Sequence, residues 1–367
     1  MAIKLELVKI RKEYGSLIAV NDMSLKVEEG ETMALLGPSG CGKSTTLNMI
    51  VGLETPTSGD ILIDGQSVSK IPLGRRNIGL VFQDYAVFTH MTVRKNIAYG
   101  LKIRRMDNAT IAREVAKVAD LLGLKDKLDR RPTELGASEQ QRVAIGRTLV
   151  TNPQILLLDE PLSNLEAEMR HQMRRELHRL QMETKQTIIY VTHDQIEALS
   201  LAHQIAVMTL GELQQYDTAY NVYLFPRSTF VGSFLGNPPM NFIRGTLRSV
   251  AGQRVVEQDG QTLPIPSAKA GAGVSDGTVV TVGIRAETVD VVKPGQPGSF
   301  NAEILAVEPQ GPESVITAKF ASSMIKIVVP TSAVAGTSGP ISILPHAKLL
   351  ALFDANSGVR LMNGAAS

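Results

Sequence analysis

The sequence predicts an α/β fold that contains a helical subdomain and is followed by a small all-β barrel domain. The α/β part is indicated by a glycine-rich stretch at residues 37–44, which directly follows a short apolar run typical of a buried strand. Helical periodicity replaces strand-like patterns over residues 84–152. Beyond residue 236, short alternating segments are typical of an all-β domain. We therefore expect one domain over 1–236, with its helical subdomain at 84–152, and a second over 237–367.

Composition limits the possible classes of function. The chain has 367 residues, of which 43% are hydrophobic and 20% charged, as in a soluble globular protein of two domains. No segment approaches the roughly 18 apolar residues of a membrane helix, and the first residues lack the apolar core of a signal peptide. The net charge of +2 indicates no nucleic-acid surface. We expect a cytoplasmic protein whose contact with a membrane comes through a partner.

Residues 37–44 fit the phosphate-binding pattern G-x-x-x-x-G-K-[ST]. Glycines permit backbone conformations in which successive amide N–H groups point at a polyphosphate, and the N-terminus of a following helix adds positive charge. Lys43 would reach the outer phosphates, and the Ser44 hydroxyl would join the coordination shell of Mg²⁺. The expected nucleotide-binding residues are Gly37, Pro38, Ser39, Gly40, Cys41, Gly42, Lys43, Ser44 and Thr45. The alternative is a glycine-rich turn that only joins a strand to a helix.

Cys41 is the single cysteine of the chain, which excludes an internal disulfide framework. It is either a small filler residue or, because Lys43 is near, a thiol with a lowered pKa that is sensitive to alkylation. The two interpretations differ in whether a thiol reagent would disturb nucleotide binding.

Two further side chains lie at the ends of predicted strands. Tyr14 follows the alternation of residues 5–10, and its ring would either stack on a purine or cover the edge of a sheet. The phosphate-binding pattern downstream favours the purine. Gln83 ends the apolar run at 78–82, where its carboxamide can offer an oxygen to a metal and a nitrogen to a water; an ordinary turn residue is the alternative.

The strongest partner of the loop is a fully apolar run at 155–158. It predicts a parallel strand covered on both faces and ends at Asp159 and Glu160. Asp159 can hold Mg²⁺, and Glu160 can polarise an attacking water. A second strand at 187–191 would bring His193 to the same ligand; taken alone, these groups would be a solvated turn and a structural histidine. The helix between the strands has an apolar stripe that we expect in the core, formed by Met169, Met173, Leu177 and Leu180.

The motifs described above occur in the same order as in the nucleotide-binding subunit of an ATP-binding cassette (ABC) transporter. The sequence resembles such a subunit over about its first two-thirds. The motifs include residues 135–142 and 163–166 as well. The likeness is greatest to the ATPases of bacterial carbohydrate and polyol importers, including maltose-type and glycerol-phosphate-type systems. The segments that carry it are Arg76–Gly79, His90–Val93, His193–Gln195 and Pro239–Asn241. The resemblance implies a P-loop NTPase fold of the ABC ATPase type with an oligosaccharide-binding-like (OB-like) barrel after it.

The resemblance also implies ATP and Mg²⁺ as cofactors and assigns roles to the residues above. Tyr14 would stack on adenine, and Lys43 would bind the β- and γ-phosphates. Glu160 would be the general base, with His193 on the γ-phosphate and Gln83 completing the catalytic set. The residues that would serve Mg²⁺ are Ser44, Gln83 and Asp159. The reaction would be in-line attack of water on the terminal phosphate.

Partners follow from the same resemblance. In the family, two ATP-binding subunits close head to tail around two ATP molecules and act on two transmembrane permease subunits at the cytoplasmic face of the bacterial inner membrane. An external solute-binding protein is an indirect partner, and no nucleic acid is expected. Residues 84–89 would receive a short helix of the permease, so that Tyr85 and Phe88 would either dock there or pack in the core.

The sequence departs from the family in the signature that contacts the ATP of the opposite subunit, which is Leu-Ser-Gly-Gly-Gln in the family. Here the signature positions are Leu135, Gly136, Ala137, Ser138 and Glu139. Gly136 lacks the hydroxyl, Ala137 and Ser138 add atoms where the backbone should approach closely, and Glu139 would place a carboxylate near phosphate oxygens. Glu166 also replaces the usual aspartate after the general base.

Two assemblies follow from this degenerate signature. In a heterodimer with a paralogous ATP-binding subunit, Glu160 and the phosphate loop would meet an intact signature from the partner, which gives one competent site. In a homodimer, both sites would contain the altered signature. The heterodimer is favoured because the groups that act in cis are complete. The homodimer, and a subunit that binds ATP with little turnover, are the alternatives.

The second domain is predicted from short strand-like segments and a turn at 356–358. The segments are 278–284, 302–307, 314–320, 324–329 and 349–353. They favour a small β-barrel, which would bind a regulatory ligand or serve in dimerisation. Arg285 and Glu287, at the end of one strand, would be interface residues or an ordinary solvated pair.

Overall fold

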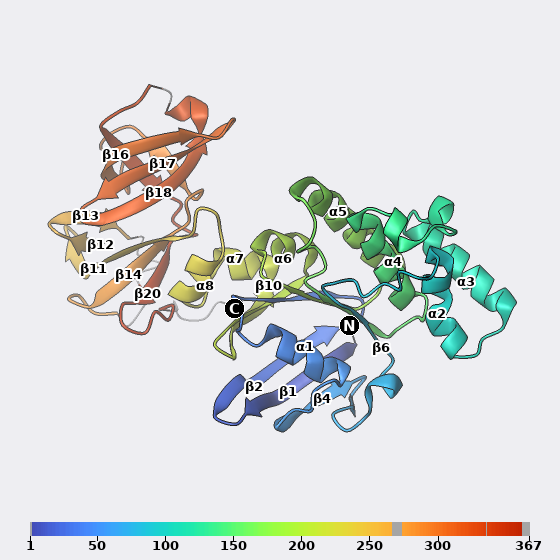
Figure 1. Ribbon diagram of the computed structural model, residues 1–367. Helices are drawn as coiled ribbons and strands as arrows, with labels where there is room; N and C mark the ends of the chain where they lie inside the picture. Colours follow the sequence, from blue (N-terminus) through green and yellow to red (C-terminus); the bar gives the residue numbers. More distant parts are fainter. Residues whose placement is uncertain (1, 266–273, 335, 362–367) are drawn as a thin grey trace. The chain divides into compact units, whose positions relative to one another are not determined.

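The computed structural model describes residues 2–265, 274–334 and 336–361 (Figure 1). The chain forms two compact units that divide between Ala219 and Tyr220. The boundary expected after residue 236 therefore falls inside the second unit, beyond the short helices α7 (Ala219–Leu224) and α8 (Thr229–Phe234). In the part of the chain that the structure describes, none of the helices has the length and hydropathy of a membrane span.

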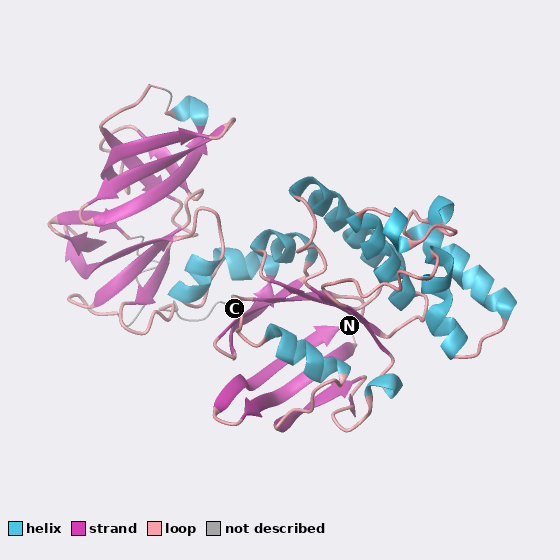
Figure 2. Cartoon of the chain, viewed as in Figure 1, coloured by secondary structure: helices cyan, strands magenta, loops and turns pink. Residues whose placement is uncertain are grey.

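The first unit is built on a six-stranded sheet (Figures 1 and 2). In sheet order its strands are β10 (Glu212–Thr218), β9 (Gln204–Thr209), β3 (Thr32–Leu36), β8 (Ile188–Thr192), β7 (Ile155–Asp159) and β6 (Ile78–Val81). All neighbours pair in parallel except β10, which is antiparallel to β9. Because parallel strands end at the same edge of a sheet, the segments that follow β3, β6, β7 and β8 come together there.

An antiparallel sheet and one helix cover one face of this parallel sheet. The strands, in sheet order, are β2 (Leu17–Glu28), β1 (Ile3–Tyr14), β4 (Ser58–Ile63) and β5 (Gln66–Ser67). Helix α1 (Lys43–Val51) lies between the two sheets, and its apolar side chains share one core with both (Figure 1). Ile155 and Leu157 of β7 belong to this core, whereas Leu156 and Leu158 belong to the core on the opposite face. This alternation explains why β7 is apolar at successive positions.

Helix α5 (Ala167–Thr184) packs in the core of the opposite face, and α6 (Gln195–Leu201) follows β8. Met173, Leu177 and Leu180 of α5 are buried as expected, but Met169 is 40% exposed and lies outside the core. The same core continues into the helices within residues 84–152, which are α2 (Val93–Ile103), α3 (Asn108–Leu121) and α4 (Ala137–Leu149). Short 3₁₀ turns occur at Leu73–Arg75, Lys125–Lys127, Pro132–Glu134 and, in the second unit, Thr331–Ala333.

The second unit contains two five-stranded antiparallel sheets (Figure 2). The first is β13 (Gln261–Pro264), β12 (Gln253–Gln258), β11 (Asn241–Val250), β14 (Val279–Ile284) and β20 (Ala351–Asp354). The second is β15 (Val289–Val292), β19 (Pro340–Pro345), β16 (Phe300–Pro309), β17 (Glu313–Phe320) and β18 (Ser323–Pro330). The two sheets share one apolar core. The Asn241 amide joins them, because its nitrogen donates to Ile284 O and Lys326 O (3.1 and 2.7 Å).

The sequence analysis expected Arg285 to be part of a solvated pair or an interface residue, and the structure corrects this expectation. The side chain is fully buried within the second unit. Its guanidinium donates to the backbone carbonyls of Tyr223 (2.8 and 3.1 Å), Gly232 (3.0 Å) and Leu235, and lies 4.2 Å from the centre of the Tyr223 ring. Glu287 instead accepts a hydrogen bond from the Tyr223 hydroxyl (2.8 Å). Arg285 thus fastens α7 and α8 to the end of β14.

We expect Arg285→Met to lower the free energy of unfolding of the second unit by roughly 3 kcal/mol, because several buried carbonyls lose a charged donor. Calorimetric unfolding of the full chain would measure the change. The matched control is Arg248→Met, which removes an exposed ion pair with Glu257 (2.8 Å) and should cost well under about 1 kcal/mol. Equal effects of the two substitutions would contradict the structural role of Arg285.

Candidate nucleotide-binding site

The glycine-rich loop connects β3 to α1 at the carboxyl edge of the parallel sheet. Gly42 has φ 101°, in the left-handed region, and a Cβ there would lie 2.4 Å from Ala19 O. A Cβ on Gly37 would lie 2.3 Å from Met208 O. Both positions therefore require glycine. The loop is wrapped closely against neighbouring strands, as a backbone cradle for a polyphosphate needs to be.

Lys43 is the central cation of the loop. Its ammonium donates to the carbonyls of Gly37 (2.8 Å) and Pro38 (3.0 Å), and the residue is only 5% exposed. Ser39 and Gly40 at the tip of the loop are exposed, as is Ser44 at the start of α1, while Thr45 is half-buried. A buried ammonium beneath exposed backbone amides and a hydroxyl fits a bound triphosphate.

Cys41 is buried, which favours the filler residue over the reactive thiol. The side chain is 3% exposed and belongs to the core shared by α1 and both sheets. Burial raises the pKa of the Cys41 thiol, and this effect exceeds the opposing effect of the Lys43 charge. Both observations favour the filler interpretation of this cysteine.

Asp159 and Glu160 lie beside the loop at the end of β7. Burial, and then the charge of Glu160, raise the pKa of Asp159, while the ammonium of Lys43 opposes the shift. Glu160 has φ 43°, a left-handed conformation that costs a non-glycine residue about 1 kcal/mol or more. Its amide N–H donates to Val191 O (2.9 Å), which ties the turn to β8.

His193 and Glu160 are brought together as the sequence predicted. The Nδ1 atom of His193 lies 3.0 Å from Oε2 of Glu160. The imidazole is exposed whereas the carboxylate is largely buried, with side-chain exposures of 54% and 19%. A carboxylate and an imidazole thus form one hydrogen-bonded pair on the sheet edge that carries the loop.

Gln83 lies on the same edge, at the end of β6. Its Nε2 donates to Ser163 Oγ at a long 3.3 Å, and its backbone oxygen accepts from Asn164 Nδ2 (2.9 Å). Ser163 Oγ in turn donates to Glu160 O (2.9 Å). The exposed carboxamide of Gln83 is therefore linked to Glu160 through Ser163, in the segment that follows Glu160.

Tyr14 ends β1 and is 45% exposed. Lys12 Nζ lies 4.9 Å from the centre of its ring and pairs with Glu54 (2.7 Å). The Tyr14 ring is thus partly exposed, and the cation beside it is a feature that the sequence analysis did not identify.

The signature segment begins α4 in the helical subdomain. The Glu139 carboxylate is paired within the chain, because Oε1 accepts from Lys127 Nζ (2.8 Å) and Oε2 accepts from the amide of Gly136 (3.1 Å). These contacts, chiefly the one with Lys127, hold the pKa of Glu139 below its usual range. Glu139 therefore caps α4 from within its first turn. Leu135 is buried, while Gly136 and Ala137 are exposed.

Three polar residues next to the site were missed by the sequence analysis. They are Arg170 on α5, Thr192 at the end of β8 and Glu197 on α6. Their one sequence signal is proximity to Glu160 and His193 along the chain. Arg170 could not be separated by that signal from the other arginines of α5, because only the folded chain shows which of them faces the site.

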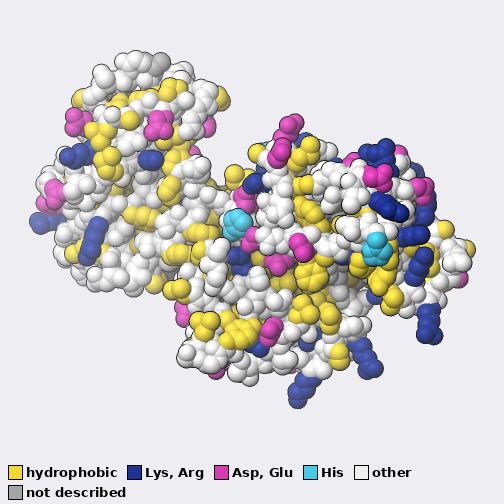
Figure 3. Space-filling view, in the orientation of Figure 1, with side chains coloured by type: hydrophobic (Ala, Val, Ile, Leu, Met, Phe, Trp, Pro, Cys, Tyr) yellow, Lys and Arg dark blue, Asp and Glu magenta, His cyan; other side chains and the backbone are white. Residues whose placement is uncertain are grey.

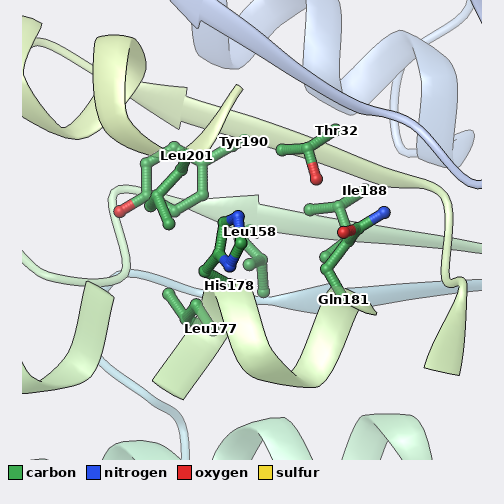
Figure 4. Close-up of a pocket in the computed structure, with 8 residues that line it drawn as sticks. All are labelled: Thr32, Leu158, Leu177, His178, Gln181, Ile188, Tyr190 and Leu201. Carbon is green, nitrogen blue, oxygen red and sulfur yellow. The ribbon is translucent and has the colours of Figure 1, made fainter. Parts of the chain in front are cut away.

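The pocket beneath α5 drawn in Figure 4 is a gap in packing. It has a volume of about 10 Å³ and is lined by Thr32, Leu158, Leu177, His178, Gln181, Ile188, Tyr190 and Leu201. This volume is at the lower limit for one water, so the pocket has no room for a ligand.

Metal ligands are sparse near the loop. Among the described residues, no group of three or more His, Cys, Asp and Glu side chains is arranged to hold a metal ion. Asp159 and the Ser44 hydroxyl are oxygen ligands of the hard kind that Mg²⁺ takes, and Mg²⁺ sites typically combine one or two carboxylates with substrate phosphates. The residues present fit such a site.

A phosphate loop, a carboxylate and histidine pair, a helical subdomain and a C-terminal β-rich unit define an ABC-type ATPase with an OB-fold domain. A family described as "ABC transporter" matches residues 20–163, and one described as "MalK OB fold domain" matches residues 236–289. The chain belongs to the ATP-binding subunits of ABC transporters, and it is an ATPase of the importer type.

Curated relatives match nearly the whole chain. The sn-glycerol-3-phosphate import ATP-binding protein UgpC of Ruegeria pomeroyi is 40% identical over 352 residues, 95% of this chain and 97% of that protein. The sulfoquinovosyl glycerol transport ATP-binding protein SmoE of Agrobacterium fabrum is 42% identical over 312 residues, 84% and 85% of the two chains. Among solved structures, CbiO1 of Clostridium perfringens, part of the ABC transporter complex CbiONQ, aligns with a TM-score of 0.57 at 27% identity, over 60% of this chain and 91% of that one.

We expect Cys41 to react with iodoacetamide at least about tenfold more slowly in the folded chain than in denaturant at pH 8, because the thiol is buried. Since the raised pKa delays formation of the thiolate, the rate in the folded chain should also begin to rise at a higher pH than for an exposed thiol. Mass spectrometry of the alkylated chain would measure both rates. Equal rates would restore the reactive-thiol interpretation.

Proposed function

We propose that this chain powers the import of glycerol phosphate or a related glycerol derivative by binding ATP and hydrolysing it in the site around Glu160. The observation that carries the proposal is the 3.0 Å pair of Glu160 and His193 on the same sheet edge as the phosphate loop. The solute class is taken from the relatives above, which are named for the import of sn-glycerol-3-phosphate and the transport of sulfoquinovosyl glycerol.

Each residue has a role in this reaction. Lys43 and the loop amides bind the β- and γ-phosphates, and the exposed ring of Tyr14 stacks on adenine. Glu160 accepts a proton from the water that attacks the terminal phosphorus, and His193 positions the γ-phosphate. Mg²⁺, when bound, neutralises charge on the phosphate oxygens. Its protein ligands would be Ser44, Asp159 and Gln83.

The partners proposed are two transmembrane permease subunits, with an external solute-binding protein acting through them at the cytoplasmic face of the bacterial membrane. CbiO1 supports the first point, because it is described as part of a transporter complex. Lys and Arg side chains gather over the helical part of the first unit, mixed with acidic ones (Figure 3). This mixture agrees with the low net charge of the chain.

The segment proposed to receive the permease contains two aromatic residues with different environments. Tyr85 is 7% exposed and belongs to the core, so packing accounts for it. Phe88 is half-buried, 4.7 Å from the ring centre of Tyr99 and 4.9 Å from Arg147 Cζ. Phe88 and Tyr99 are therefore the aromatic pair that we propose for docking.

The assembly proposed is a homodimer, which was the alternative in the sequence analysis. The relatives support an importer ATPase and give no support for a second, paralogous subunit. The contacts of Glu139 also favour the homodimer, since a carboxylate already paired with Lys127 repels phosphate less than a free one. Gly136 still lacks the signature hydroxyl, so modest turnover is part of the proposal.

We expect Glu160→Gln in the full chain to reduce the rate of ATP hydrolysis by roughly 10² to 10⁴, because the amide cannot accept the proton of the attacking water. ATP affinity, measured with a fluorescent analogue, should change less than about threefold. Glu168→Gln, an exposed glutamate at the start of α5, is the control and should keep the wild-type rate. Full activity of Glu160→Gln would remove this carboxylate from the reaction.

We expect Glu139→Gln to change the rate of hydrolysis by less than about threefold, because Lys127 already balances the charge it removes. A rise of tenfold or more would mean that the carboxylate does repel the nucleotide.

The homodimer is tested in the same assay by adding the nearest paralogous ATP-binding subunit from the same cell. An ATPase gain over either chain alone would instead establish the heterodimer.

A further inference from the structure

A small polar chamber lies directly behind the pair of Glu160 and His193. Its volume is about 60 Å³, enough for a few waters and too small for a nucleotide. Apart from that pair, the side chains that line it are Ser163, Arg170, Thr192, Asp194 and Glu197. None of these five is used in the reaction proposed above. The chamber contains three carboxylates, from Glu160, Asp194 and Glu197, and the guanidinium of Arg170.

Arg170 connects the two chain segments that carry the catalytic pair. Its Nε donates to Leu165 O (3.0 Å) in the segment that follows Glu160. Its Nη1 lies 3.6 Å from Oδ2 of Asp194, the residue after His193. The side chains of Arg170 and Asp194 are 37% and 26% exposed, so the ion pair is only partly screened by solvent. A planar guanidinium can hold both partners at once, which an ammonium does less well.

Asp194 passes this restraint to the backbone around His193. Its Oδ1 accepts from the amides of Ile196 (2.8 Å) and Glu197 (3.3 Å) and so caps α6. Its own amide donates to Thr192 Oγ1 (2.9 Å). The residues on both sides of His193 are thus fixed by hydrogen bonds.

Glu197 also restrains the turn that contains His193, through hydrogen bonds to the end of β8. The residue is 3% exposed, and its Oε2 accepts from Thr192 Oγ1 (2.8 Å) and from the Tyr190 hydroxyl (2.9 Å). Burial raises the pKa of Glu197, while these hydrogen bonds and the charge of Arg170 oppose the shift. Thr192 therefore receives one hydrogen bond and donates another, which leaves little freedom to the turn that presents the imidazole.

We propose that Arg170 is a positioning residue for ATP hydrolysis: by holding Leu165 O and Asp194 together, it sets the separation of Glu160 and His193. The inference rests on the proposed function. Catalysis is sensitive to this separation, because a misplacement of about 1 Å can cost up to 10² in rate. Arg170 touches neither the nucleotide loop nor the adenine site, so its loss should affect hydrolysis more than binding.

The test uses Arg170→Met in the full chain, with Arg175→Met as the matched control. Arg175 lies on the same helix, is exposed, and lines an open groove on α5 and α6 away from the chamber. We expect Arg170→Met to lower kcat by roughly tenfold, with the affinity for a fluorescent ATP analogue within about twofold of wild type. Arg170→Lys, which keeps the charge but not the fork, should restore part of the rate.

Two further measurements separate positioning from simple destabilisation. Asp194→Asn keeps a cap for α6 but removes the charge, and its effect on kcat should not add to that of Arg170→Met. Amide hydrogen exchange without nucleotide should become faster at residues 192–197 and 163–166 in Arg170→Met and stay unchanged at residues 37–45.

A kcat for Arg170→Met equal to that of Arg175→Met would overturn the inference, as would a parallel loss of ATP affinity and thermal stability. Unchanged exchange at 192–197 would also overturn it. If the unmodified chain hydrolysed no ATP, the proposed function would fail, while the exchange measurement would still decide whether Arg170 restrains these segments.

Discussion

The parallel pairing of β3, β6, β7 and β8 is the constraint on which the rest of the first unit depends. The register pairs Leu36 with Thr192 and Asp159 with Val191, so that polar chain ends emerge together from strands that are otherwise apolar. A sheet of this kind must be covered on both faces, which α1 and α5 do. The helices that bury the strands also begin or end beside the site. Packing and chemistry therefore use the same elements.

Much of this arrangement could be predicted from local patterns. The apolar run of β7 and the glycine-rich loop are continuous in sequence, and each has a physical reason that needs no partner. The pairing of Glu160 with His193 required that the two strands be parallel and adjacent in the sheet. The ties of Arg170 to Leu165 and Asp194 could not be predicted, because α5 carries several arginines and its rotation about its own axis is set by packing. The burial of Cys41 likewise depends on distant strands.

The signature segment contains a charge whose partner within the chain the sequence alone does not reveal. Glu139 was interpreted as facing a phosphate, since the family has glutamine there. In the folded chain Glu139 is the third residue of α4, where its carboxylate accepts a hydrogen bond from the amide of Gly136 at the N-cap. Lys127, in an adjacent turn, pairs with the same carboxylate. Capping of the first turn of α4 is therefore a structural role for Glu139. The missing hydroxyl at Gly136 has no comparable compensation.

The buried guanidinium of Arg285 has a consequence for how the chain can be divided. The carbonyls that receive it belong to residues 223, 232 and 235, which precede the start of the OB-family match at residue 236. A fragment that began at residue 237 would retain the cation but lose every one of these acceptors, together with the Tyr223 ring that packs against the guanidinium. The compact unit that keeps these contacts starts at Tyr220. Helices α7 and α8 are thus held to the strands of the second unit by Arg285, and they are part of its structure.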